Sequence, residues 1–212
     1  MSTGEVRVTV SVSVEVLDTR NVIAEKPGTE PDGGVVILGG HYDTVPDVPA
    51  ANDNGSGIAT LMAIAGEVSD QTYPFTLRFI AFGSEETGLD GSRFYIDSLG
   101  PDELKDLIAM LNFDALGTGR VAAVLGDPDL TDLVSRYGES NGIEVETRRS
   151  LKEGTSSDHA PFAEAGVPVV FFLADDFSRI HTPEDRLEFI QPELLGNHAA
   201  LAIGLLSDLA GR

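Results

Sequence analysis

The chain has 212 residues, 42% of them hydrophobic, which is enough to bury the core of one large domain. It carries 35 Asp and Glu residues against 14 Lys and Arg residues, and the formal net charge of -21 argues against anionic partners, namely DNA, RNA and membrane lipid. The absence of cysteine excludes disulfide bonds and thiolate metal ligands, although it leaves the cellular compartment open.

Apolar runs separated by glycine, proline and polar residues predict strands that alternate with helices. The run at 35–38 is continuous, which is typical of a strand buried on both faces, and 76–82 is predicted to be another buried strand. In chain order, the predicted elements are a strand at 6–16, a strand at 21–25, a loop at 26–34, a strand at 35–38, a helix at 57–68, a strand at 76–82, a mixed helical and loop segment at 94–107, strands at 108–113 and 121–125, a helix at 130–138, a strand at 168–173 and a helix at 192–209.

This alternation predicts an α/β fold, a three-layer α/β/α sandwich around a central mixed, mostly parallel sheet. Neither an internal repeat nor a linker interrupts the chain, so we expect one domain over residues 1–212. In such sheets the chemistry lies beyond the carboxyl ends of the strands.

Acidic and histidine residues stand at five points along the chain, most of them directly after a predicted strand. Histidine and carboxylate ligands together suit zinc, and a site for two ions also needs a carboxylate that can bridge them. One more carboxylate can then take a proton from an activated water, which predicts a metal-dependent hydrolase. The five points are His41-Tyr42-Asp43, Asp53, Glu85-Glu86, Asp114 and His181.

Two of these points indicate a division of labour between neighbouring residues. His41 and Asp43 are two residues apart, so in extended backbone they point the same way, and Asp43 can accept the second ring N–H of His41. Of the adjacent pair, one glutamate can bind metal while the other faces the substrate as a proton acceptor.

Several of these motifs also have ordinary structural explanations. Taken alone, Asp53 in its glycine-rich stretch reads as a turn and helix cap, and an acidic pair such as Glu85-Glu86 is common on surfaces. Asp158 is predicted to cap a helix, residues 182–185 to start one and so position His181, and His198 to be a surface or packing residue.

Six motifs occur in the order found in the di-zinc aminopeptidase family, peptidase family M28, which the chain resembles from about residue 21 to its C-terminus. The family includes bacterial leucyl aminopeptidases and, more remotely, glutamate carboxypeptidases, glutaminyl cyclases and the transferrin receptor. The motifs are GGHYDT at 39–44, NDNGSG at 52–57, FGSEETGLDGS at 82–92, NFD at 112–114, SDHAPF at 157–162 and HTPED at 181–185.

The resemblance implies a zinc-exopeptidase-like fold with two Zn²⁺ ions and a role for each of seven residues. It also implies a cis peptide bond after the bridging aspartate. By position, His41 and Asp114 would hold one zinc, Glu86 and His181 the other, Asp53 would bridge both, Glu85 would be the general base acting on a water between the ions and then the acid for the leaving amine, and Asp43 would orient His41.

The activity that the resemblance favours is that of an aminopeptidase acting on peptides with a free N-terminus. The same family offers a carboxypeptidase or dipeptidase, a glutaminyl cyclase working with one zinc, and a non-catalytic scaffold of the transferrin-receptor type. Arg148-Arg149 bears on the carboxypeptidase or dipeptidase, because arginine binds a substrate carboxylate bidentately.

The chain departs from many relatives in two ways. Some aminopeptidases of the family have a tyrosine shortly before the Ser-Asp-His segment, whereas here the last tyrosine is Tyr137 and residues 154–157 contain none, so the donor to the oxyanion is unassigned. The protease-associated domain that many relatives carry is also missing, so we expect a trimmed core of a longer protein. Localisation, oligomeric state, side-chain preference and native metal stay open at this stage.

The acidity of the chain has two explanations that sequence leaves open. It can serve as a solubilising surface, or it can be an adaptation to concentrated salt. Stability that rises with KCl concentration would favour adaptation, and stability independent of salt would exclude it.

Overall fold

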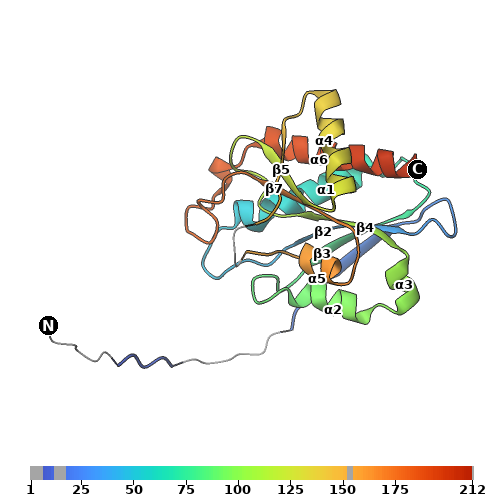
Figure 1. Ribbon diagram of the computed structural model, residues 1–212. Coiled ribbons are helices and arrows are strands. Elements are labelled where there is room, and N and C mark those ends of the chain that lie inside the picture. The colour runs from blue at the N-terminus through green and yellow to red at the C-terminus, as the bar shows by residue number, and fades with distance from the viewer. Residues whose placement is uncertain (1–6, 12–17, 152–154, 212) are drawn as a thin grey trace.

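A single sheet crosses the middle of the molecule in the computed structural model, which describes residues 7–11, 18–151 and 155–211 (Figure 1). Its strands lie in the spatial order β1-β3-β2-β4-β7-β5-β6. Their bounds are β1 (Val22–Lys26), β2 (Val35–His41), β3 (Thr76–Phe82), β4 (Leu107–Phe113), β5 (Ala122–Gly126), β6 (Val145–Thr147) and β7 (Val169–Ala174).

Strands β3, β2, β4 and β7 run parallel to one another and form the centre of the sheet. Strand β1 pairs antiparallel with β3, β5 pairs antiparallel with β7, and β6 pairs parallel with β5. The predicted mixed, mostly parallel sheet is therefore confirmed. Because the four central strands are parallel, their carboxyl ends meet at one edge.

Helices cover both faces of this sheet and complete the three predicted layers (Figure 1). Helices α1, α4 and α6 pack on one face, and α2, α3 and α5 lie on the other. The bounds are η1 (Ala51–Ser56), α1 (Gly57–Glu67), α2 (Asp90–Ser98), α3 (Pro101–Lys105), α4 (Pro128–Asn141), α5 (His159–Glu164), η2 (Leu187–Phe189) and α6 (Pro192–Ala210).

Each face of the sheet has its own core, because successive side chains of a strand point to opposite faces. Val36 and Leu38 of β2 belong to the core under α1, α4 and α6, whereas Ile37 belongs to the opposite one. In that second core the ring of Phe82 packs edge-on against Phe162, with centroids 6.0 Å apart. This double burial explains why β2 begins with four consecutive apolar residues, Val35–Leu38.

Two predicted elements differ from the structure. Of the predicted strand at 6–16, residues 6 and 12–16 lie outside the described residues, and 7–11 form no strand. A strand needs a partner for its backbone groups, and no described strand pairs with 7–11. The predicted helix start at 182–185 is instead a turn, and regular structure resumes only at η2.

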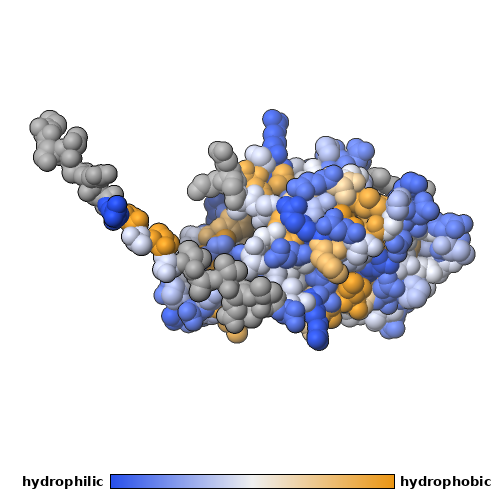
Figure 2. Space-filling view, turned by 90° about the horizontal axis from the view of Figure 1, so that it is seen from below, coloured by the Kyte–Doolittle hydropathy of each residue, from blue (hydrophilic) through white to orange (hydrophobic). Residues whose placement is uncertain are grey.

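The face covered by α2, α3 and α5 is mostly hydrophilic, and its apolar residues appear as separate patches (Figure 2). Phe94 on α2 is one of the largest exposed apolar side chains. In the part of the chain that the structure describes, no helix combines the length and apolar character needed to cross a membrane.

His198 on α6 is buried in the core rather than exposed, so of its two predicted settings packing is correct. Its ring lies edge-on to Phe172, with centroids 6.3 Å apart, and neither ring nitrogen has a hydrogen-bond partner among the described residues. Burial lowers the pKa of His198 from 6.5 to about 3. The folded chain therefore holds a neutral imidazole that the unfolded chain protonates below pH 6.5.

Acidification is therefore expected to destabilise the fold through His198. The loss begins as the pH falls below 6.5 and continues toward 3, at about 1.4 kcal/mol per pH unit. Urea unfolding of the wild type and of His198→Leu at pH 7 and pH 5 checks this, because the difference between the two chains should change by about 2 kcal/mol. Parallel pH dependence in the two chains would contradict it.

Candidate metal centre

The five points singled out in the sequence come together at the carboxyl edge of the sheet. His41 is the last residue of β2, Asp114 directly follows β4, and Glu85-Glu86 lie in the turn after β3. Asp53 is in η1, and His181 is in the loop after β7. The central parallel strands thus deliver side chains that are far apart in sequence to one place.

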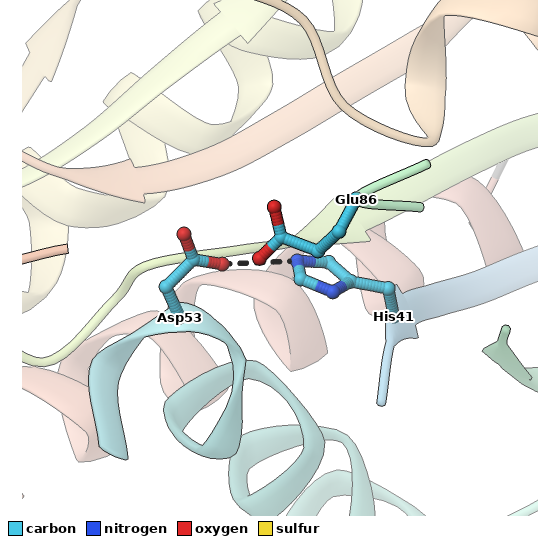
Figure 3. Close-up of side chains that lie close together, drawn as sticks. All are labelled: His41, Asp53 and Glu86. Atoms are coloured by element: carbon cyan, nitrogen blue, oxygen red, sulfur yellow. Dashed lines mark ion pairs between the residues drawn. The ribbon is translucent and has the colours of Figure 1, made fainter. Parts of the chain in front are cut away.

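Asp53 stands at the centre of this cluster, with one oxygen directed to each of two histidines. Its Oδ1 is 3.1 Å from Nε2 of His41, and its Oδ2 is 3.0 Å from Nε2 of His181. Nε2 of His41 is also 3.5 Å from Oδ1 of Asp114, and Nε2 of His181 is 3.2 Å from Oε2 of Glu86. Figure 3 shows His41, Asp53 and Glu86 turned toward one another.

These contacts fit the coordination of divalent metal. Ligand atoms about 2.0–2.1 Å from a tetrahedral ion lie roughly 3.3 Å from one another, close to the spacings within the cluster. His41 Nε2 is buried and makes no hydrogen bond of good geometry with any described residue. Each of the groups His41-Asp53-Glu86 and His41-Glu85-Asp114 offers ligand atoms within 4.8 Å of one another.

The electrostatics of the cluster also call for added positive charge. Burial raises the pKa of Asp53 and of Glu86, and nearby carboxylates add to both rises. Burial raises the pKa of Glu85 to about 9. The His41 imidazole next to Asp114 keeps the pKa of that buried carboxyl low despite its burial. Buried carboxylates of this density are stabilised when they coordinate a cation.

Asp43 holds the turn that carries the two glutamates. Its carboxylate accepts hydrogen bonds from the backbone N–H of Glu85, at 3.0 Å, and of Glu86, at 3.3 Å. For Nδ1 of His41 the nearer acceptor is the backbone carbonyl of Asp43, at 3.0 Å, while the carboxylate is 3.7 Å away. Asp43 thus contacts both sides of the cluster, through different atoms.

Two buried hydrogen bonds in series, which the sequence did not reveal, orient the carboxylate of Asp114. The Ser157 hydroxyl donates to Asp114 Oδ2 at 2.7 Å, and the Asn112 amide donates to the Ser157 hydroxyl at 2.8 Å. Because Oδ2 is occupied in this way, Oδ1 is the atom turned toward His41. Ser157 belongs to the SDHAPF motif, but its role depends on a contact across 43 residues.

Three residues around the cluster adopt a left-handed backbone conformation, which is uncommon for residues other than glycine. Ser84, Ala115 and His181 all have φ near +60°, and each is a candidate ligand or lies next to one. Such left-handed residues cost of order 1–3 kcal/mol each and concentrate at functional sites. The peptide bond between Asp53 and Asn54 is cis, which confirms the expectation drawn from the resemblance.

Asp185 fastens the turn that contains Asp53, a role that the sequence did not reveal. Its carboxylate accepts hydrogen bonds from the backbone N–H of Asn52, at 2.7 Å, and of Asp53, at 3.0 Å. Its backbone carbonyl accepts a third from Ala51, at 3.2 Å. Since Asp185 lies four residues beyond His181, it ties the His181 loop to the Asp53 turn.

Asp185→Asn is expected to weaken the binding of a divalent metal ion by about 10- to 100-fold, because an amide cannot accept both backbone hydrogen bonds. Competition with a chromophoric chelator measures the dissociation constant. Glu184→Gln is the matched control, since it removes the same charge from an exposed side chain next door. Equal affinity in the two variants would exclude this positioning role.

Asp158 differs from its predicted role as a helix cap. It occupies the N-cap position of α5, but its side chain makes no capping hydrogen bond. The carboxylate is fully buried, and burial raises the pKa of Asp158 to about 7. It lies close enough to Glu85 for its charge to add to the rise in the pKa of Glu85.

The cluster opens on a cavity of about 640 Å³ whose walls beyond the carboxylates are largely apolar. Tyrosine is absent from these walls in the described chain, while Thr155 and Ser156 line them. The apolar side chains of the walls are Leu89, Ala115, Leu151, Phe171, Leu173, Phe177 and Ile180. A cavity of this kind accommodates a small, partly apolar ligand next to the candidate metal ligands.

Comparisons with known proteins agree with this architecture. The aminopeptidase YwaD of Bacillus subtilis is 38% identical over 189 residues, which cover 84% of this chain and 42% of YwaD. The solved structure of BSAP, a zinc aminopeptidase from Bacillus subtilis, superimposes with a TM-score of 0.81 at 32% identity, covering 89% of this chain and 49% of that one. A glutaminyl cyclase from an Acidobacteriales bacterium matches with a TM-score of 0.76 at 25% identity, covering 91% of this chain and 74% of that one.

The chain thus spans about half the length, or less, of the two aminopeptidases that it matches. Within the chain, the model of peptidase family M28 matches residues 21–206, which include the whole central sheet and every residue of the cluster. The chain belongs to peptidase family M28.

Proposed function

We propose that the chain is the catalytic part of a di-zinc aminopeptidase, which removes N-terminal residues from peptides. The observation that carries the proposal is the position of Asp53. Its two carboxylate oxygens face two separate ligand pairs, His41 with Asp114 and His181 with Glu86. A bridging carboxylate between two such pairs is what a two-metal site requires.

His41, Asp53, Glu86, Asp114 and His181 would hold two zinc ions, which would supply Lewis-acid polarisation of the scissile carbonyl and a water acidic enough to react near neutral pH. In the proposed mechanism Glu85 would accept a proton from the attacking water and then deliver it to the departing amine. This role needs the carboxylate form of Glu85, which the positive charge of bound ions would favour over the protonated form. Two features support this role. Glu85 lines the cavity, and the carboxylate of Asp43 holds its backbone N–H.

A free N-terminus would be selected at the metal end of the cavity, which is lined by Asp53, Glu85, Glu86 and Asp114. A free α-amine offers a nitrogen lone pair that a bound ion could accept, whereas an acylated amine does not. The apolar walls would receive the first side chain of the substrate, which favours apolar residues there. The similar proteins from Bacillus subtilis are an aminopeptidase and a zinc aminopeptidase, which supports the same activity.

A glutaminyl cyclase is the second candidate, and its support is the structural match to such an enzyme. It would cyclise an N-terminal glutamine with one zinc ion. The two ligand pairs around Asp53 favour the two-ion peptidase over it.

A substrate panel with metal analysis tests the proposal. We expect about two zinc ions per chain and hydrolysis of leucine p-nitroanilide that a chelator abolishes. An N-acetylated substrate should be resistant. Hydrolysis of the acetylated substrate alone would overturn the aminopeptidase assignment. Release of pyroglutamate from a glutaminyl substrate, without hydrolysis of the leucine substrate, would establish the cyclase instead.

A further inference from the structure

Arg148 is a basic residue in a cavity whose other charged residues are acidic. It follows β6, and its backbone N–H donates to the carbonyl of Val124 at 2.8 Å, which anchors it to the sheet. Among the described residues that line the cavity, it is the only lysine or arginine. In a chain with 14 basic residues and a net charge of -21, this placement calls for an explanation.

The side chain of Arg148 is held in place by two neighbours. Its Nε donates to Oε1 of Glu146 at 3.3 Å, and its guanidinium lies 5.8 Å from the centre of the Phe177 ring. Phe177 is itself part of the apolar wall, and the Arg148 side chain is only 19% exposed. The guanidinium is therefore fixed against the wall of the cavity and does not extend into solvent.

These contacts leave one edge of the guanidinium available. Glu146 occupies Nε, whereas Nη1 and Nη2 have no hydrogen-bond partner in the part of the chain that the structure describes. Arg148 also forms no ion pair with Asp53, Glu85, Glu86 or Asp114, so it is not a partner of the metal cluster. Arg148 lines the cavity, and the two parallel N–H groups on the available edge of its guanidinium match the two oxygens of a carboxylate.

We propose that Arg148 binds a carboxylate of the substrate, a proposal that rests on the proposed peptidase function and defines its substrates further. The cavity then has a metal end for the N-terminal amine, an apolar wall for a side chain, and a cationic group for a carboxylate. A substrate carboxylate can have two sources, the C-terminus of a short peptide or an acidic side chain. Both present the same group to the guanidinium.

Two pairs of substrates separate these sources. Leucyl-leucine and its C-terminal amide differ only in the terminal carboxylate, and glutamyl and glutaminyl p-nitroanilide differ only in a side-chain carboxylate. For each pair, the ratio of kcat/KM of the acid to that of its neutral partner measures the preference. Arg148→Met is expected to lower one of the two ratios by roughly tenfold or more.

Arg149→Met is the matched control, because Arg149 is the exposed neighbour of Arg148 and does not line the cavity. It should keep both ratios. Arg148→Lys should recover part of the lost preference, since lysine keeps the charge but not the paired N–H groups. If Arg148→Met leaves each of the two ratios at its wild-type value, the proposal is overturned.

Calorimetric binding distinguishes failure of this proposal from failure of the proposed function. Leucyl-leucine and its amide are titrated into zinc-loaded Glu85→Ala protein, with and without Arg148→Met. If leucyl-leucine binds more tightly than its amide, and Arg148→Met removes this difference, the carboxylate site is supported even if the wild type hydrolyses nothing. For the side-chain source, glutamyl and glutaminyl amide are titrated in the same way. Absence of any such preference, with hydrolysis intact, leaves the peptidase and removes the carboxylate site.

Discussion

Glu85→Ala is expected to lower kcat for leucine p-nitroanilide by about a thousandfold while leaving the metal content at the wild-type value. Glu85 faces His41 and Asp114 within the cluster, but the two ligand pairs around Asp53 are complete without it. Removing it deletes the proton acceptor and leaves the ligands. Steady-state kinetics and elemental analysis on the same preparation measure both quantities.

Glu86→Ala is the matched control for Glu85, because it removes the neighbouring carboxylate from the same turn. Glu86 lies 3.2 Å from His181 Nε2, so this variant should lose metal as well as turnover. The contrast between the two glutamates is the informative result. Loss of metal from Glu85→Ala, or full turnover by it, would assign the proton acceptor elsewhere.

Much of the fold follows from local sequence patterns, and the differences have physical causes. The apolar run at 35–38 predicts β2, but the strand continues through Gly39 and Gly40 to His41. Glycine usually ends a strand, whereas here it is needed because a Cβ on Gly40 would lie 2.5 Å from the carbonyl oxygen of Phe113. Strand β6 was missed because three residues at the end of the sheet carry too little periodicity.

Some residues of the candidate site can be predicted from local sequence patterns, and others cannot. His41, Asp114 and the acidic pair can be predicted because each stands at or shortly after the end of a strand, and strand ends are visible in the sequence. Asp185 and Ser157 cannot be predicted in this way, because they act through contacts with residues 132 and 43 positions away. Sequence therefore indicates the candidate ligands, while the residues that orient them emerge only from the folded chain.

The position of Asp53 predicts how many zinc ions remain bound when single metal ligands are substituted. If Asp53 bridges, Asp53→Ala is expected to lose both zinc ions, because each pair keeps only two protein ligands. Asp114→Ala affects one pair only, and it is expected to keep about one ion, next to Glu86 and His181. Elemental analysis after dialysis against a weak chelator gives these contents directly.

The turnover and the stability of each variant should depend on its zinc content. An ion contributes several kcal/mol of transition-state stabilisation, so Asp53→Ala should lose roughly a thousandfold or more of kcat/KM. Added zinc should stabilise the wild type by about 4 kcal/mol at a thousandfold excess over its dissociation constant, and thermal unfolding should show little of this in Asp53→Ala. Retention of one ion and of the zinc-dependent stabilisation by Asp53→Ala would mean that its carboxylate belongs to a single ion, and the two-ion mechanism would then lose its main support.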